Sequence, residues 1–259
     1  MAVTPTEGRD RLCSILLEDD PTDGLWELCD SGDAALVVPE LPALELEQDP
    51  IHRHKDVLAH TIAVTSKTRP DLTVRLAALF HDIGKPATRS FEHGGVTFRH
   101  HEAVGAKMTK RRLRELEFEK PLVKDVAELV RLSGRFKGYG DGWSDAAVRR
   151  YAREAGHLLG DLNELVRSDC TTRNRAKEQR LHRLIDELEE RIVELARADA
   201  EAAERPQIDG KAVMDRFGVD GGPLIGQALA HLLQVKRSEG ELPEAELYDR
   251  LDQWWAENS

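Results

Sequence analysis

The segment at residues 75–86 reads Arg-Leu-Ala-Ala-Leu-Phe-His-Asp-Ile-Gly-Lys-Pro, and the fold prediction rests on it. Its apolar run, preceded by Pro70, predicts a buried helix over 71–83, and the Gly-Lys-Pro sequence that follows predicts the helix stop. His81 and Asp82 therefore lie at the end of a buried helix. A buried carboxylate needs compensation, and an imidazole nitrogen beside a carboxylate oxygen can bind a divalent cation. We infer a candidate metal site at this helix end.

Helical patterns continue on both sides of this stretch. Residues 55–67 are amphipathic, and 39–42, which begin and end with proline, predict an extended connection. Residues 91–99 contain two adjacent glycines and predict a small hairpin or loop. Because no strand alternation is long enough for a larger sheet, we expect an all-α protein. Its other helices are expected at 10–18, 23–29, 101–116, 121–132, 144–153, 157–169, 174–203, 213–217, 223–236 and 243–255.

The composition favours a helical protein without a membrane-spanning segment. Hydrophobic residues make up 40% of the 259, enough to bury a core, while aromatic residues make up only 5%. No apolar run could span a bilayer, and the first ten residues do not resemble a signal peptide. The three cysteines have no metal-site or redox spacing. We therefore expect a cytoplasmic protein with reduced thiols and no membrane partner.

The net charge of -11 is unevenly distributed along the chain. Residues 1–50 hold 2 basic and 13 acidic side chains, and residues 191–259 hold 8 basic and 14 acidic ones. Residues 51–190 hold 27 basic and 21 acidic side chains, so this segment alone carries a net positive charge. The whole-chain charge argues against non-specific nucleic-acid binding, but it leaves room for a local basic surface on the middle segment.

Three further residues could complete the metal site. His60 lies on the preceding helix, His101 opens the helix after the 91–99 segment, and Asp169 ends a later helix. Metal sites in helical bundles are built from inward side chains on facing helices. Each residue also has an ordinary explanation, as a core histidine, a histidine at a helix start and a helix cap. Taken together with His81 and Asp82, they favour the metal site.

The order His60, His81-Asp82, Asp169 resembles that of the HD superfamily of metal-dependent phosphohydrolases. The chain is more similar still to the HD-containing half of bacterial CCA-adding tRNA nucleotidyltransferases, from about residue 24 to the C-terminus. Several matching blocks in order are more specific than any one of them. The resemblance implies an HD-domain helical bundle over 51–204, an acidic helical lead-in at 1–50 and a small helical tail at 205–259. The matching stretches are 39–44, 54–61, 75–86, 169–174, 209–210 and 222–226.

The resemblance also implies roles for these residues. The metal ligands would be His60, His81, Asp82 and Asp169, holding a divalent Ni, Mn, Co, Fe or Mg ion. Asp82 and Lys85 would be catalytic, with Asp82 orienting or deprotonating a water and Lys85 contacting the phosphate. Ser133 stands where the family often has a histidine that helps to hold a second ion. We therefore expect one ion, with a weaker second site possible near His101. The substrate contacts would be Lys85, Arg173 and His101.

The activity that the resemblance implies is hydrolysis of a phosphoester. Nucleotide 2′,3′-cyclic phosphates and RNA terminal phosphates are the expected substrates, so the partner would be a nucleotide or a tRNA-like RNA. Nothing in these residues corresponds to the family's nucleotidyltransferase head, and we expect no nucleotide addition. Two alternatives remain open: a non-catalytic tRNA- or RNA-binding module, and a helper subunit of a separate nucleotidyltransferase. The sequence does not indicate an oligomeric state.

Overall fold

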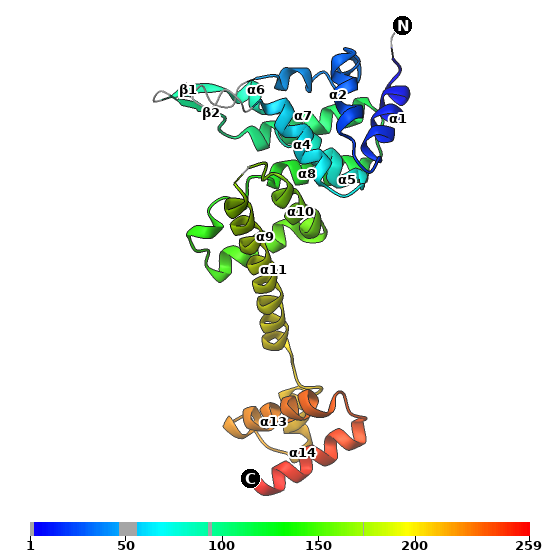
Figure 1. The fold of residues 1–259 in the computed structure, drawn as a ribbon. Coiled ribbons are helices and arrows are strands. Elements are labelled where there is room, and N and C mark those ends of the chain that lie inside the picture. Colours follow the sequence, from blue (N-terminus) through cyan, green and yellow to red (C-terminus); the bar gives the residue numbers. More distant parts are fainter. Residues whose placement is uncertain (1–2, 47–55, 93–94, 173) are drawn as a thin grey trace. The chain divides into compact units, whose positions relative to one another are not determined.

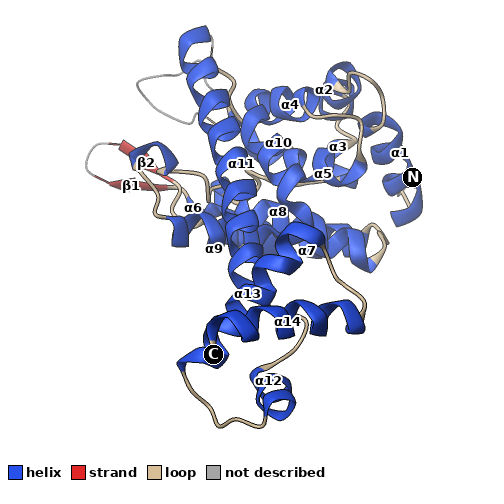
Figure 2. Cartoon of the chain, turned by 90° about the horizontal axis from the view of Figure 1, so that it is seen from below, coloured by secondary structure: helices blue, strands red, loops and turns tan. Residues whose placement is uncertain are grey.

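The computed structural model describes residues 3–46, 56–92, 95–172 and 174–259. The chain divides into two compact units, residues 1–192 and 193–259. Both are helical, and the strands of the described chain form one short hairpin (Figure 2), so the prediction of an all-α fold is confirmed. Among the described residues, no helix combines the length and the apolar character that a membrane crossing requires.

The acidic N-terminal segment is folded against the bundle. Helix α1 (Pro5–Leu16) begins with a capping box between Thr4 and Glu7 and packs on α5 (Leu72–Phe80). Helix α2 (Thr22–Asp30) packs on α4 (Val57–Lys67). The short helices α3 (Ala34–Val37) and η1 (Pro42–Leu44) follow α2. These segments lie in the same compact unit as the metal-site candidates.

The extended connection expected at 39–42 is wrong. The chain turns there, with the Leu41 amide donating to the Val38 carbonyl, and continues into the 3-10 helix η1. Leu41 takes a right-handed helical conformation although a proline follows it. Val38, Leu41 and Leu44 are all fully buried, so packing of these three side chains outweighs the local preference.

Helix α5 is the centre of the first unit, and its residues from Val74 to Phe80 are all buried. It packs against α4, α8 (Lys120–Leu132) and α10 (Leu159–Ser168), and α8 in turn packs against α7 (His101–Glu115) (Figure 1). The apolar side chains on these helices form the core. Helix α9 (Asp145–Ala155), capped by Ser144, leads through η3 (Gly156–Leu158) into α10. The 3-10 turn η2 (Tyr139–Asp141) precedes α9, and α11 (Arg175–Ala203) follows α10.

Helix α5, which was predicted over 71–83, ends earlier than its sequence predicts. It stops at Phe80, and residues 81–84 form a tight turn in which the Lys85 amide donates to the Asp82 carbonyl. A second short helix, α6 (Lys85–Thr88), then begins at the expected stop signal. Pro86 sits in its first turn, where an amide hydrogen would have no partner in the helix, so the proline starts a helix here instead of ending one.

A two-stranded antiparallel hairpin follows α6, as the 91–99 segment predicted. Strands β1 (Ser90–Glu92) and β2 (Gly95–Thr97) pair Ser90 with Thr97 and Phe91 with Val96. In both views the hairpin extends away from the helices of its unit (Figures 1 and 2). Residues 98–100 then lead directly into α7.

The second unit has its own core. Helices α12 (Gly210–Phe217), α13 (Pro223–Glu239) and α14 (Glu244–Asn258) pack in sequence order. Phe217 stacks on Trp255 with ring centroids 4.1 Å apart, which gives one tryptophan of the terminal pair a packing role. The unit begins inside α11, whereas the expected tail begins at residue 205. Its buried core residues are Val213, Ile225, Ala228, Leu232, Leu247 and Leu251.

Arg75 joins the N-terminal segment to the central helix. The side chain is 1% exposed and donates only to backbone carbonyls. Its guanidinium reaches the Leu16 carbonyl at the end of α1 (2.7 Å) and the Asp19 carbonyl (2.9 Å), and it also donates to Glu18 and Thr68. Carbonyls at the end of a helix carry partial negative charge, so a buried cation suits them.

We predict that Arg75→Met lowers the free energy of unfolding by about 3 kcal/mol, because several buried carbonyls lose their donor. Urea unfolding followed by circular dichroism measures this loss, and hydrogen exchange should place it in α1 and α5. The matched control is Arg131→Met, since Arg131 is 40% exposed and pairs with Glu128 on its own helix. That change should cost at most about 0.5 kcal/mol. Equal losses in both variants would contradict the role given to Arg75.

Candidate metal centre

A pocket of about 510 Å³ lies where five segments of the first unit meet. His60 enters from α4, His81 and Asp82 from the turn after α5, and Asp169 from the end of α10. The start of α7 and the residues after α8 complete the wall. Apart from Arg173, every site residue expected from the sequence lines this pocket. The lining residues are His60, His81, Asp82, Lys85, Phe98, Arg99, His100, His101, Glu102, Ser133, Gly134, Lys137 and Asp169.

The three histidines nearest the centre are each held by the ring nitrogen that faces away from it. Nδ1 of His60 lies 2.9 Å from the Thr171 hydroxyl, and Nδ1 of His81 donates to the Ala78 carbonyl at 2.6 Å. Nδ1 of His101 donates to the Phe98 carbonyl at 2.8 Å. Such bonds fix the ring orientation and leave Nε2 free to act as a ligand.

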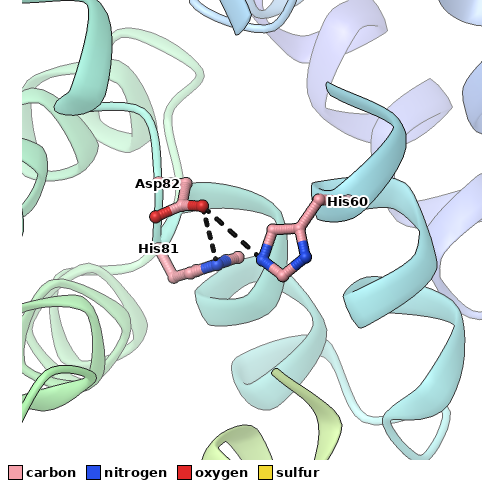
Figure 3. Close-up of side chains that lie close together, drawn as sticks. All are labelled: His60, His81 and Asp82. Carbon is pink, nitrogen blue, oxygen red and sulfur yellow. Dashed lines mark ion pairs between the residues drawn. The ribbon is translucent and has the colours of Figure 1, made fainter. Parts of the chain in front are cut away.

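The Nε2 atoms converge on two carboxylates. Asp82 Oδ2 lies 3.2 Å from His81 Nε2 and 3.6 Å from His60 Nε2 (Figure 3). Asp169 Oδ1 lies 3.0 Å from His60 Nε2 and 3.6 Å from His81 Nε2. His60, His81 and Asp82 each offer one ligand atom, and these three atoms all lie within 4.8 Å of one another. This group could therefore hold a metal ion.

His81 Nε2 is a buried polar atom without a hydrogen-bond partner in the described structure. Leaving such an atom unpaired costs free energy, so its position calls for an explanation. The atom faces the Asp82 carboxylate, and imidazole nitrogen with carboxylate oxygen is a donor set that suits divalent transition ions. The residues present therefore fit a bound cation.

The buried charges explain how the site is balanced without a metal. Burial alone would lower the pKa of His81, but Asp82 and Asp169 outweigh it and raise that pKa to about 9. Burial would raise the pKa of Asp82, but His81, Lys85 and His60 hold it well below its usual range. His81 is therefore protonated at neutral pH beside an ionised Asp82. Metal binding would have to displace that proton.

Lys85 and His101 take up neighbouring positions. Lys85 Nζ is 2.6 Å from Asp82 Oδ2 and lies 5.7 Å from the centre of the Phe98 ring. His101 Nε2 is 3.5 Å from Asp82 Oδ1, and burial lowers the pKa of His101. Both side chains thus contact the opposite oxygens of one carboxylate. Arg173, expected to bind substrate, lies outside the described residues.

The structure adds residues that the sequence did not single out as functional. Thr171 orients His60 and sits two residues after Asp169, so its position in that block was a usable signal. Phe98 supplies the carbonyl for His101, but no pattern marks it. Glu102 pairs with Lys137 across the pocket at 3.1 Å. Ser133 lines the pocket, with its hydroxyl donating to the Val130 carbonyl of its own helix.

Gly84 lets α7 approach the turn that carries Asp82. A Cβ built on Gly84 would lie 2.7 Å from the Gly105 amide nitrogen and would also collide with the His101 carbonyl. Both obstacles are backbone atoms and cannot rotate away. Glycine is thus required here by the close approach of two backbones, and this approach keeps His101 beside Asp82.

The fold and this cluster define an all-α domain with a histidine–carboxylate centre, and comparison with known families agrees. The model of the HD domain family matches residues 57–204. The chain belongs to the HD domain family, which places it in a superfamily of metal-dependent phosphohydrolases.

Two curated relatives match most of the chain. The A-adding tRNA nucleotidyltransferase of Deinococcus radiodurans is 32% identical, covering 97% of this chain and 58% of that protein. The CC-adding tRNA nucleotidyltransferase of Thermus thermophilus is 32% identical, covering 90% of this chain and 53% of that protein. The chain thus spans about half the length of the relatives it matches. The expected resemblance to HD-containing tRNA nucleotidyltransferases is confirmed.

We predict that Gly84→Ala destabilises the first unit by about 1–3 kcal/mol, because α7 must shift away from the turn. The shift should also move His101 from Asp82, which a change in the His101 NMR titration would report. Gly160→Ala is the matched control, since a Cβ there meets no atom within 4 Å. Equal stabilities for the two variants would show that the close approach is not required.

Proposed function

We propose that this chain is a metal-dependent phosphohydrolase that acts on nucleotide 2′,3′-cyclic phosphates or RNA terminal phosphates. The observation that carries the proposal is the convergence of His60, His81, Asp82 and Asp169 in one pocket, with His81 Nε2 buried, without a hydrogen-bond partner and facing the two carboxylates. Membership of the HD domain family supports the reaction class. The relatives act on tRNA, which supports an RNA or a nucleotide as the substrate.

His60, His81, Asp82 and Asp169 would hold one divalent ion. A bound ion of this kind polarises a phosphoryl oxygen and lowers the pKa of a bound water. Nickel, manganese, cobalt and iron suit a mixed imidazole and carboxylate set, and magnesium is the harder alternative. A second ion would have His101 and Glu102 nearby, but Ser133 supplies no ligand nitrogen there. We therefore assign one ion.

Asp82 and Lys85 are the proposed catalytic pair. Asp82 is held in its ionised form, so its oxygens can accept hydrogen bonds from an attacking water and orient it. Lys85 keeps its ammonium at the pocket wall, where it can offset charge on a phosphoryl group once a cation shares Asp82.

Substrate contacts are proposed for Lys85, His101 and Arg173. The Nδ1 bond of His101 leaves Nε2 as an acceptor on the neutral ring, directed toward the pocket. A hydroxyl of the substrate could donate to it. For Arg173 we propose a bidentate phosphate contact, and this proposal rests on the sequence alone.

We predict turnover of 2′,3′-cyclic nucleotides or 3′-phosphorylated RNA with Mn²⁺, Co²⁺ or Ni²⁺, and its loss in Asp82→Ala by at least about 100-fold. Phosphate release and chromatography of nucleotide products measure this across a panel of phosphoesters and metals. Leu36→Ala, on the exposed face of α3, is the control for handling and folding. Metal-loaded protein with no turnover above Asp82→Ala would reject the hydrolase and favour an RNA-binding module.

We predict that metal binding releases about one proton per chain at pH 7–8. His81, with a pKa of about 9, is protonated before metal binds, whereas a ligand imidazole must be neutral. Metal affinity should therefore rise with pH and level off above about 9. Calorimetric titration with Mn²⁺ in buffers of different ionisation enthalpy measures the release.

The control for proton release is His157→Ala, because His157 pairs with Asp125 and does not line the pocket. It should release the same number of protons as the unmodified chain. A binding enthalpy that is independent of the buffer would show that His81 gives up no proton, and so is not a ligand.

A further inference from the structure

The β1–β2 hairpin leaves the helical body at the wall of the pocket. Lys85, at the start of α6, lines the pocket just before the hairpin, and Phe98 and Arg99 line it just after β2. Both ends of the hairpin are thus fixed at the site, while its strands extend away from the helices (Figure 2). A substrate whose phosphate entered the pocket would pass this element.

The hairpin carries an aromatic ring in solvent. Phe91 is 74% exposed, the most exposed of the large apolar side chains in the described chain. The Arg89 guanidinium lies over its ring, 5.2 Å from the ring centre. Because the Phe91 ring is exposed to water, it contributes no burial of apolar surface to folding. A ligand that covered the ring would remove this apolar surface from water, which would favour binding.

The register sets how far the backbone of Phe91 lies along the hairpin from the pocket residue Phe98. Phe91 pairs with Val96, which precedes the pocket residue Phe98 by two positions. At about 3.3 Å per strand residue, the separation along the strand is about 7 Å. That distance matches the scale of a single nucleotide, with the phosphate in the pocket and the base outside it.

We propose that Phe91, backed by Arg89, is a stacking platform for the nucleobase next to the phosphate held in the pocket. This inference rests on the proposed function, because it takes the pocket to be the phosphate site. Aromatic faces and arginine planes bind bases of any sequence by stacking, and a cation over the ring adds to the attraction. The hairpin would thus select phosphoesters that carry a base over those that do not.

The test compares variants and ligands in pairs, by fluorescence anisotropy with Ca²⁺ in place of a transition ion, chosen so that a cation fills the site while hydrolysis is suppressed. The probes are a labelled ten-nucleotide RNA with a 3′-phosphate and the same RNA with an abasic last nucleotide. Phe91→Ala should bind the first RNA about tenfold more weakly than the unmodified chain. Its affinity for the abasic RNA should not change.

Further variants separate stacking from simple apolar contact. Phe91→Trp should bind the base-bearing RNA at least as tightly as the unmodified chain, whereas Phe91→Leu should lose most of the affinity. Leu36→Ala removes another exposed apolar side chain, on α3, and should change nothing. Competition by 2′,3′-cyclic AMP that depends on Phe91 would show that a free nucleotide suffices. Competition only by RNA would identify an RNA end.

The inference is overturned if Phe91→Ala binds both RNAs as the unmodified chain does, or weakens both equally. It is also overturned if Phe91→Leu restores full affinity. These outcomes are distinct from failure of the proposed function, which is loss of any turnover above Asp82→Ala. If the chain binds the base through Phe91 but hydrolyses no substrate, the stacking proposal stands and the hydrolase proposal is wrong.

Discussion

The first unit depends on one constraint, an ionised carboxylate kept almost wholly out of water. Asp82 is 2% exposed, at the end of a helix whose last seven residues are buried. Burying a charge is costly unless other charges and hydrogen bonds compensate it. His60, His81, Lys85 and His101 all lie within 3.6 Å of its oxygens. Four segments of the chain are therefore tied to one carboxylate, which is a strong reason to regard the cluster as a functional centre.

Local sequence patterns were enough to place the helices, and the order of the site residues was enough to bring the site together. His60, His81-Asp82 and Asp169 lie far apart in the chain, and their resemblance to a known order predicted a pocket that the structure shows. Local rules failed where packing decided the outcome. Burial of Leu41 and Leu44 turned 39–42 into a compact turn, and the close contact of Gly84 with α7 made Gly84-Lys85-Pro86 a junction between helices. Phe98 acts through its backbone carbonyl, which leaves no pattern in a sequence, whereas the position of Thr171 in the 169–174 block was a signal that could have been used.

Of the three segments compared above, only residues 51–190, which supply the pocket, carry a net positive charge. The segment around the pocket carries the excess of basic residues, whereas residues 191–259 carry 14 acidic against 8 basic side chains. A polyanion would therefore meet its most favourable field at the pocket and its hairpin. In the second unit, by contrast, aromatic side chains pack against one another, as in the Phe217–Trp255 stack. This contrast supports the hairpin ring of Phe91, and not the terminal tryptophans, as the aromatic surface for a base.

We propose that the two imidazoles of His60 and His81 and the carboxylate of Asp82 hold one cation. Pulsed electron paramagnetic resonance of Mn²⁺ added to the purified chain tests it most directly, because coupling to ¹⁴N reports each ligand imidazole. We expect coupling to two imidazole nitrogens in the unmodified chain and to one in His60→Ala. A Mn²⁺ spectrum without nitrogen coupling, or one that His60→Ala leaves unchanged, would contradict it.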